Sequence, residues 1–136
     1  MPSLLLDTCA VIYIAENQPI ASSARRQVIA AGNDGGVLVS PVSAWEIGLL
    51  ASRRGLIFLP DPKAWFSEFL ASPGVRLTPL TPEIAIESSF LAPPLRNDPA
   101  DRLLMATACA LGVPIVTRDV AILEYARRDF VSAIAC

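Results

Sequence analysis

The amino-acid sequence predicts an α/β domain with a central, mainly parallel sheet of four or five strands flanked by helices. Short apolar runs with strand character alternate along the chain with longer runs of helical periodicity. Alternation of this kind is typical of a parallel sheet that is covered on both faces. The length of 136 residues predicts one domain, residues 1–136. A domain of this size buries about 68% of its unfolded surface and needs no disulfide or zinc staple.

Each predicted element is bounded by turn and capping residues. Gly55 and Gly112 end two helices, and Asn33-Asp34-Gly35-Gly36 is a loop. Pro79 weakens the third strand, and the last strand is expected at an edge of the sheet. The predicted strands are 3–6, 37–39, 75–80, 115–117 and 130–134. The predicted helices are 9–15, 19–31, 42–54, 63–71, 82–91, 99–111 and 120–127.

Apolar side chains at helical spacing predict which helices are buried. The helix that contains the apolar run 103–111 is apolar on nearly all sides, which is typical of a buried helix. Trp45 is expected in the core, because aromatic residues dominate protein cores. An aromatic cluster is also expected in the core, with a dimer or partner surface as the alternative; it comprises Trp65, Phe66, Phe69 and Leu70.

Composition excludes several kinds of chemistry. The chain has no histidine, which removes Ser-His-Asp and Cys-His catalysis, zinc fingers and haem attachment. Its three cysteines, Cys9, Cys109 and Cys136, form no CxxC pair and are expected to be buried, reduced thiols. A net charge of −2 argues against a strongly cationic nucleic-acid surface. Local arginine patches remain compatible with it, because every basic residue except Lys63 is an arginine.

The sequence also predicts where the protein resides. No apolar run approaches the roughly 18 residues that a membrane-spanning helix needs. The N-terminal MPSLLLDTCA lacks a basic leader and carries Asp7 too early for a signal peptide. We therefore expect a protein that does not cross a membrane and resides in the cytoplasm.

Four acids are expected to meet at one edge of the sheet. Asp7 and Asp119 each follow a predicted strand, Asp101 begins the helix before the strand 115–117, and Glu46 lies early in another helix. The carboxyl ends of parallel strands face a single rim. Four carboxylates there would repel one another unless a cation lay among them, and Mg²⁺ or Mn²⁺ prefers oxygen ligands. Without histidine, such a site indicates phosphodiester hydrolysis.

Helix capping is the alternative role for some of these acids. Asp98 before Pro99 is a good helix start, and a negative charge at Asp101 favours the helix dipole. Asp7 is equally suited to cap the helix 9–15. Capping and metal binding therefore both remain open for Asp7, while Asp98 is interpreted first as a cap.

Four segments together resemble a PIN domain, and specifically a VapC-type toxin ribonuclease of a type II toxin–antitoxin system. They are LLLDT, VSAWEIG around Glu46, NDPADRLLMATA around Asp101, and VPIVTRD, which ends at Asp119. The resemblance implies an acidic quartet of Asp7, Glu46, Asp101 and Asp119, accompanied by the hydroxyls of Thr8 and Thr117. It also implies a bound Mg²⁺ or Mn²⁺, endonucleolytic cleavage of RNA, a homodimer, and a cognate antitoxin as partner.

The segment around Asp101 departs from the pattern of similar sequences. Relatives with a DPxDR motif often carry a histidine just upstream and a phenylalanine between the acids. This chain has Arg96-Asn97 and Ala100 at those places. Asp98 is then a candidate for a fifth, outer acid, and the choice of RNA substrate is expected to differ.

Other roles stay open beside the nuclease interpretation. Arg102 and Arg118 each neighbour a quartet acid and are candidates to contact RNA phosphate, to dock an antitoxin segment, or to pair with the acids. The helices around 20–31 and 42–54 are expected to form a groove that takes a partner helix. An inactive PIN-like module that binds RNA or protein is the alternative function. An aspartyl phosphotransfer site at Asp7 fits poorly, because Cys9 stands where a second acid is needed.

Overall fold

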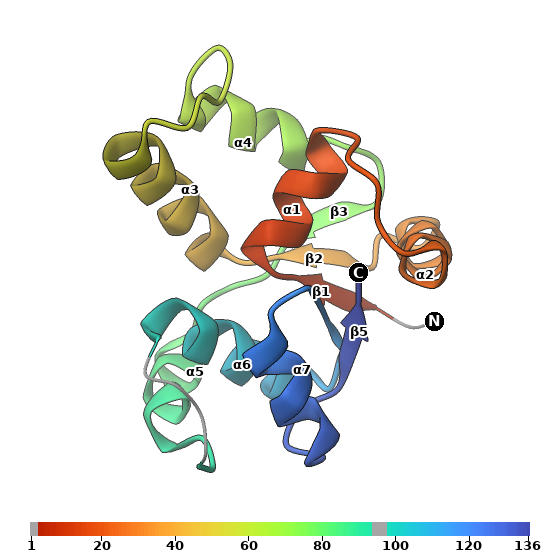
Figure 1. Ribbon diagram of the computed structural model, residues 1–136, viewed down its shortest axis with the longest axis vertical. Helices are drawn as coiled ribbons and strands as arrows, with labels where there is room; N and C mark the ends of the chain where they lie inside the picture. The colour runs from red at the N-terminus through yellow and green to blue at the C-terminus, as the bar shows by residue number, and fades with distance from the viewer. Residues whose placement is uncertain (1–2, 94–97) are drawn as a thin grey trace.

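The computed structural model describes residues 3–93 and 98–136, and within them five short strands form one parallel sheet (Figure 1). The strand order is β3-β2-β1-β4-β5, and each pair of neighbours is parallel. The strands are β1 (Leu4–Leu6), β2 (Val37–Val39), β3 (Val75–Leu77), β4 (Ile115–Thr117) and β5 (Ala133–Ala135). The predicted α/β class is confirmed, and β5 lies at an edge as expected.

Capping residues explain where most helices begin and end. Side-chain oxygens of Asp7, Ser40, Asp61, Thr81, Asp98 and Asp119 each accept a hydrogen bond from a first-turn backbone N–H. Gly55 and Gly112 end α3 and α6 in the left-handed conformation, with φ of 68° and 66°. The helices are α1 (Thr8–Ala15), α2 (Ser22–Gly32), α3 (Pro41–Arg54), α4 (Pro62–Leu70), α5 (Pro82–Glu87), the 3₁₀ turn η1 (Ser88–Phe90), α6 (Pro99–Leu111) and α7 (Val120–Arg127).

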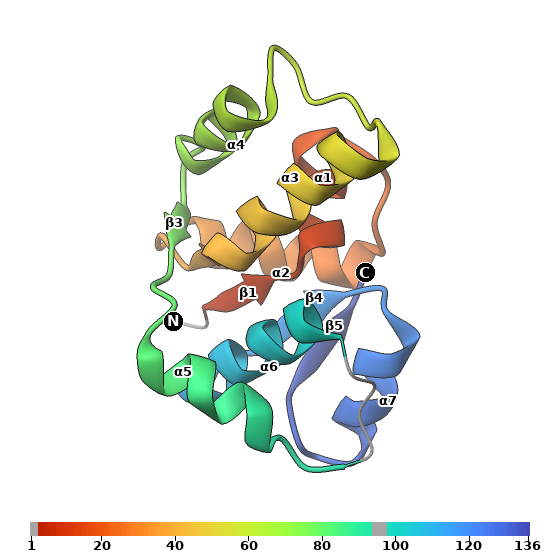
Figure 2. The same cartoon turned by 90° about the vertical axis from the view of Figure 1, so that its left-hand side faces the viewer.

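The sheet separates two apolar cores because alternate strand residues point to opposite faces. Leu4 and Leu6 of β1 pack with residues of α1, α2, α3 and α4, whereas Leu5 packs with residues of α6 and α7. Figures 1 and 2 show these two groups of helices on opposite sides of the sheet, with α5 beside α6. No helix in residues 3–93 and 98–136 is long and apolar enough to cross a membrane.

Two strand predictions were wrong at their ends. The third strand stops at Leu77 rather than at residue 80, because Pro79 has no N–H to donate to a neighbouring strand. The last strand is Ala133–Ala135 rather than 130–134. Residues before it are used in the turn that ends α7, where Asp129 has a φ of 63° and donates its N–H to Ala126 O.

Two helix predictions also differ in extent. The helix predicted from residue 19 begins at Ser22, and the one predicted over 82–91 is an α-helix only to Glu87 and continues as η1. The helix with the run 103–111 is buried through its middle, from Leu104 to Ala108, but its last residues are exposed. It is therefore buried in its middle and ends at the surface.

The prediction that Trp45 belongs to the core was wrong. Its side chain is 48% exposed, because Val42, Ser43 and Ile47 form the buried face of α3 and Trp45 lies on the other side. The aromatic cluster on α4 does lie in the core, through the buried side chains of Trp65, Phe66 and Phe69.

The prediction of buried thiols was also wrong. Cys9 and Cys109 are exposed, and Cys136 is half-buried; all three are free cysteines. Cys9 lies on the outward side of the first turn of α1, between the buried Thr8 and Ala10.

Candidate active site

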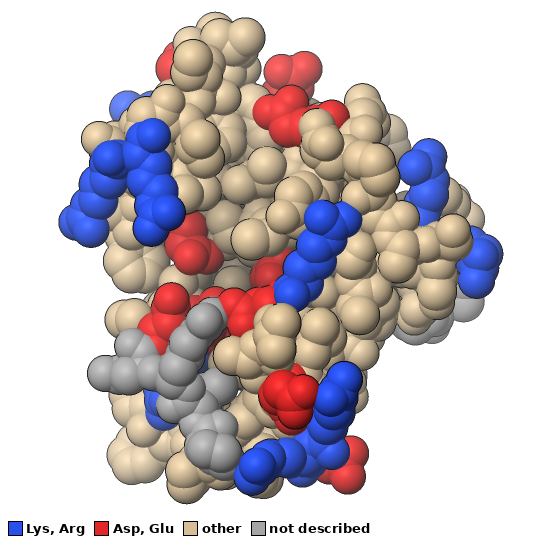
Figure 3. Space-filling model, in the orientation of Figure 1, with Lys and Arg blue, Asp and Glu red and all other residues tan. Residues whose placement is uncertain are grey.

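The structure brings the predicted acids to the carboxyl edge of the sheet. Asp7 follows β1 and Asp119 follows β4, and these two strands are hydrogen-bonded neighbours. Glu46 lies on α3, which follows β2, and Asp101 lies in the first turn of α6. In Figure 3, acidic side chains gather at the middle of the face where α1, α3, α6 and α7 begin in Figure 1.

Asp7 is the most buried of these acids, with 5% of its surface exposed. Its Oδ1 accepts a hydrogen bond of 2.8 Å from Ala10 N, and its Oδ2 accepts one of 2.5 Å from Thr117 Oγ1. The pKa of Asp7 is raised from 3.8 to about 6, chiefly by burial and also by the charges of Asp101 and Asp119, while the two hydrogen bonds oppose the rise. Asp7 therefore caps α1 with one oxygen and binds the Thr117 hydroxyl with the other.

Thr117 connects two of the acids. Its side chain is fully buried, donates to Asp7 and accepts a hydrogen bond of 2.9 Å from Asp119 N. Asp119 in turn caps α7, since its Oδ1 accepts from Ala121 N at 2.8 Å and from Ile122 N at 3.3 Å. One hydroxyl thus fixes the side chain of Asp7 and the backbone of Asp119.

Thr8 links Ser43 and Glu46 through hydrogen bonds. The hydroxyl of Thr8 forms hydrogen bonds with Glu46 Oε1 and, at 3.1 Å, with Ser43 Oγ. Burial raises the pKa of Glu46, the charges of Asp101, Asp98 and Asp7 raise it further, and the Thr8 hydrogen bond opposes the rise. Ser43 was not among the residues that the sequence indicated. The spacing Ser43-x-x-Glu46, which places both side chains on one helical face, is the signal that could have found it.

Asp98 has the capping role that its position before Pro99 predicted. Its Oδ1 accepts a hydrogen bond of 3.1 Å from Asp101 N at the start of α6. Its charge nevertheless contributes to the raised pKa of Glu46, so Asp98 lies at the outer margin of the same group of acids. A fifth, outer acid and a helix cap are therefore compatible roles for one side chain.

The site fits a hard divalent cation in donor type and in charge. Its donors are carboxylate and hydroxyl oxygens, and each of the acids Asp7 and Glu46 is destabilised as an anion by the charge of Asp101. Within the described ranges, no three His, Cys, Asp or Glu side chains are close enough as they stand to hold one metal ion. Ligation by three carboxylates therefore requires side-chain rotation.

The two arginines beside the acids contact other parts of the chain. Arg102 Nε donates to Ser88 O at 2.9 Å, which ties the start of α6 to η1. The guanidinium of Arg118 lies 4.1 Å from the centre of the Tyr13 ring, and its Nη2 donates to Pro19 O at 2.5 Å. Arg118 thereby holds the loop after β4 against α1 and the segment that follows it.

Of the residues near Asp101 that differ from similar sequences, the structure describes only Ala100. Arg96 and Asn97 lie outside the described residues. Ala100 is buried and packs in the same apolar cluster as Leu104 and Tyr125. The small side chain therefore occupies a core position on α6 rather than one facing the acids.

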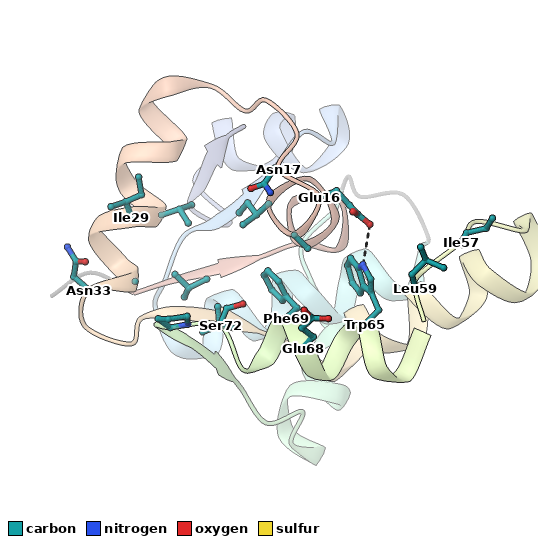
Figure 4. Close-up of a pocket in the computed structure, with 17 residues that line it drawn as sticks. Glu16, Asn17, Ile29, Asn33, Ile57, Leu59, Trp65, Glu68, Phe69 and Ser72 are labelled. Carbon is teal, nitrogen blue, oxygen red and sulfur yellow. Dashed lines mark hydrogen bonds between the residues drawn. The ribbon is translucent and has the colours of Figure 1, made fainter. Parts of the chain in front are cut away.

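A groove with a volume of about 960 Å³ lies at the other end of α1 (Figure 4). It runs between α2 and α4 and is lined by apolar side chains that include Ile14, Val28, Ile29, Ile57, Leu59 and Phe69. Trp65 Nε1 donates to Glu16 Oε1 at 3.2 Å within it. The predicted groove between 20–31 and 42–54 was wrong, because α1 lies between α2 and α3 (Figure 1).

This is an α/β domain with acids gathered at the carboxyl edge of a parallel sheet, and its sequence matches a known family. The family model described as "PIN domain" matches residues 4–128. The chain belongs to the PIN domain family. It is also 28% identical over 119 residues to Ribonuclease VapC22 of Mycobacterium tuberculosis, with 88% of each chain covered.

Solved structures show the same fold. The chain resembles DNA-bound VapBC from Salmonella typhimurium with a TM-score of 0.67 at 16% identity, covering 99% of this chain and 98% of that one. It resembles VapBC2 from Rickettsia felis, bound to a promoter DNA fragment, with a TM-score of 0.64 at 12% identity, covering 97% of each chain. At these identities the likeness concerns the fold.

Proposed function

We propose that this chain is a metal-dependent endoribonuclease that hydrolyses RNA phosphodiester bonds and acts as the toxin of a type II toxin–antitoxin pair. The observation that carries the proposal is the gathering of Asp7, Glu46, Asp101 and Asp119 at one edge of the sheet in a PIN domain. The relative from Mycobacterium tuberculosis is named a ribonuclease, which supports the same reaction. The proposal treats residues 1–136 as one PIN domain that acts on RNA in the cytoplasm.

Asp7, Glu46, Asp101 and Asp119 would hold the metal, with Mg²⁺ or Mn²⁺ as the ion that carboxylates suit. When bound, such an ion polarises the scissile phosphate and lowers the pKa of a water molecule. The four carboxylates make both a one-metal and a two-metal site feasible. The general base is not assigned to any one of them.

The chain's own residues orient this set of ligands. Thr117 directs Asp7 Oδ2 away from the helix cap and ties it to the backbone of Asp119. Thr8 restrains Glu46 in the same way from the start of α1. Such partners fix the rotamers of ligand side chains, so less conformational freedom is lost when the ligands close on an ion.

Arg102 and Arg118 are proposed to contact RNA phosphate beside the acids. Each guanidinium has further N–H groups besides the one that holds it to the protein. If Arg102→Ala left both cleavage and RNA binding at wild-type levels, the RNA role of that residue would be excluded. Arg118→Ala also removes the contacts with Tyr13 and Pro19, so its test must include a thermal melt.

The cognate antitoxin is proposed to bind in the groove between α2 and α4. The groove exposes Ile57 and Leu59, and its charged lining residues are acidic, Glu16 and Glu68, with no Lys or Arg among the described residues that line it. It therefore suits an apolar segment with a basic residue. The solved complexes of VapC-like chains with their antitoxins support such a partner.

A homodimer is proposed as the working form of the nuclease. Exposed apolar side chains outside the groove, such as Trp45 and Phe90, are consistent with further protein contacts. Sedimentation velocity at micromolar concentration distinguishes a dimer from a monomer, and a monomer at all concentrations would remove this part of the proposal.

The decisive experiment is cleavage of a mixed structured RNA by purified, antitoxin-free protein with Mg²⁺ or Mn²⁺. The proposal expects cleavage that EDTA abolishes and that the Asp7→Asn variant lacks. RNA that is bound but never cleaved, with folded protein and either metal, would instead establish the binding-module alternative. If no RNA is cleaved, a Mn²⁺ titration distinguishes the two remaining explanations. Mn²⁺ binding by the wild type that is lost in Asp101→Asn would indicate a nuclease with a narrow RNA target, and no Mn²⁺ binding would indicate a site without metal.

A further inference from the structure

Ser43 lies next to the acidic edge but is neither an acid nor a residue that the family resemblance singled out. It is in the first turn of α3, its side chain is fully buried, and it is three residues before Glu46. Its Oγ is 3.1 Å from Thr8 Oγ1, which is also hydrogen-bonded to Glu46. Three side chains from α1 and α3 thus form a continuous hydrogen-bonded chain.

The number of hydrogens on each group determines which side chain donates in these two hydrogen bonds. A hydroxyl has one hydrogen to donate, and a carboxylate can only accept. If Glu46 is ionised, the hydrogen of Thr8 points to Glu46, and the contact between Ser43 and Thr8 must be a donation from Ser43. Ser43 therefore acts on Glu46 through Thr8.

Ser43 has a local alternative that it does not use. A serine in a helix commonly donates back to the carbonyl three or four residues earlier. Here those carbonyls already accept backbone hydrogen bonds, Ser40 O from Ser43 N at 3.0 Å and Val39 O from Thr78 N at 2.8 Å. The hydroxyl of Ser43 reaches across to α1 instead.

Burial makes this contact hard to replace. Ser43 is 0% and Thr8 is 6% exposed, so solvent has little access to either hydroxyl. If Ser43 were removed, Thr8 would lose the donor that fixes its hydroxyl rotamer, and water could not readily substitute. The carboxylate of Glu46 would then lose the restraint that the Thr8 hydroxyl provides.

We infer that Ser43 is a positioning residue that orients Glu46 toward the metal through Thr8. This inference rests on the proposed function, in which Glu46 is a metal-binding carboxylate. It adds a residue on α3 that contacts neither metal nor RNA yet sets the metal affinity of the site.

The test measures Mn²⁺ binding in the absence of RNA, by the electron paramagnetic resonance signal of free Mn²⁺. Ser43→Ala is expected to weaken binding roughly 10-fold, the lower end of the range for partners of metal ligands. Ser43→Cys keeps a weak donor of similar size and should fall between Ser43→Ala and wild type. Thr8→Val should weaken binding at least as much, and Thr8→Ser should restore most of that loss.

A double-mutant cycle separates positioning through Thr8 from a general packing effect. If Ser43 acts through Thr8, the variant with both Ser43→Ala and Thr8→Val binds Mn²⁺ no more weakly than Thr8→Val alone. Thr107→Val is the matched control, because Thr107 is fully buried on α6 and its hydroxyl donates to Leu103 O. It should bind Mn²⁺ like the wild type.

Cleavage kinetics provide a second readout. At a fixed, subsaturating Mn²⁺ concentration, Ser43→Ala is expected to lower kcat and leave KM for RNA nearly unchanged, with kcat recovering at high Mn²⁺. Wild-type Mn²⁺ affinity in Ser43→Ala, or losses that multiply in the double variant, would overturn the role of Ser43 while leaving the nuclease proposal intact. Absence of Mn²⁺ binding by the wild type would overturn both.

Discussion

The two ends of α1 belong to surfaces of opposite character. At its start, the buried Asp7 and Thr8 lie beside other carboxylates and hydroxyls. At its end, Ile14 and Glu16 line an apolar groove. A helix of eight residues is roughly 12 Å long, so the acidic edge and the groove are separated by little more than one short helix.

The two surfaces are held by different forces. At the acidic edge, hydrogen bonds from Thr117, Thr8 and a helix N–H group restrain Asp7 and Glu46 in spite of the repulsion among the acids. At the groove, the side chains of Ile57 and Leu59 are 78% and 72% exposed and bury little of their surface in this chain. The acidic edge therefore concentrates negative charge, whereas the groove is suited to a second apolar surface.

Substitution of Asp7 should affect only one of these surfaces and have the largest effect of all. Asp7→Asn keeps a good cap for α1 but removes a negative charge from the metal site. We expect the rate of RNA cleavage to fall by at least 100-fold, because loss of a residue that merely supports a metal ligand already lowers metal affinity or activity about 10- to 100-fold. The affinity for antitoxin should change by less than about twofold. Equal loss of antitoxin binding would show that the two surfaces are not independent.

Stability should also depend on Asp7, in a defined pH range. The folded chain holds the Asp7 proton up to a pKa of about 6, against 3.8 for an ordinary carboxyl. The tighter hold on this proton stabilises the folded state fully below about pH 4, and the stabilisation is lost as the pH rises through 6. The free energy of unfolding should fall by about 3 kcal/mol at most over this range. Urea unfolding in EDTA between pH 4 and 7 should show this loss in the wild type relative to Asp7→Asn. Parallel curves for the two proteins would contradict the raised pKa.

Most of the architecture was predictable from the sequence because its signals are local. Apolar runs of strand length, caps such as Asp7 and Asp98, and end signals such as Gly55 each act within a few residues. Apart from the third strand, which Pro79 shortens, most errors fell where tertiary contacts decide. The packing of Phe130 on Tyr125, with ring centres 4.9 Å apart, belongs to the turn after α7 that delays β5, and no sequence pattern signals it.

The candidate site was predictable in its acids and, through the family resemblance, in the hydroxyls of Thr8 and Thr117, but not in Ser43. Positions just after a strand or early in a helix place all four acids at one rim once a parallel sheet is assumed, and the family resemblance indicates the same four. The hydrogen bond between Ser43 and Thr8 depends on how α3 packs across α1. The order of residues in the sequence does not specify that packing. The groove position was also missed, because which helices are neighbours depends on the placement of α1 between α2 and α3.

Disruption of the groove should produce the reverse of the Asp7 result. Ile57→Asp places a charge on an exposed apolar position of the groove rim and adds to the acids already there. We expect the affinity for co-purified cognate antitoxin, measured by surface plasmon resonance, to fall about 10- to 100-fold, because apolar anchors of an interface contribute about 1–3 kcal/mol. Metal-dependent cleavage by the free protein should be unchanged.

A matched substitution outside the groove controls for the added charge. Ile86→Asp changes an exposed isoleucine on α5, which does not line the groove. It should leave antitoxin affinity at the wild-type level. Equal losses for Ile57→Asp and Ile86→Asp would mean that net charge, rather than the groove, controls the affinity.

Neutralising one acid of the groove should have the smallest effect. Glu16→Gln keeps an oxygen that can accept the hydrogen bond from Trp65 Nε1 but removes the charge at the end of α1. If a basic residue of the antitoxin lies near Glu16, the affinity should fall by about threefold, within the range of a partly exposed ion pair, and the loss should disappear at 1 M salt. Glu83→Gln on exposed α5 is the control and should show no change. A salt-independent loss in Glu16→Gln would assign the effect to packing around Trp65 instead of to charge.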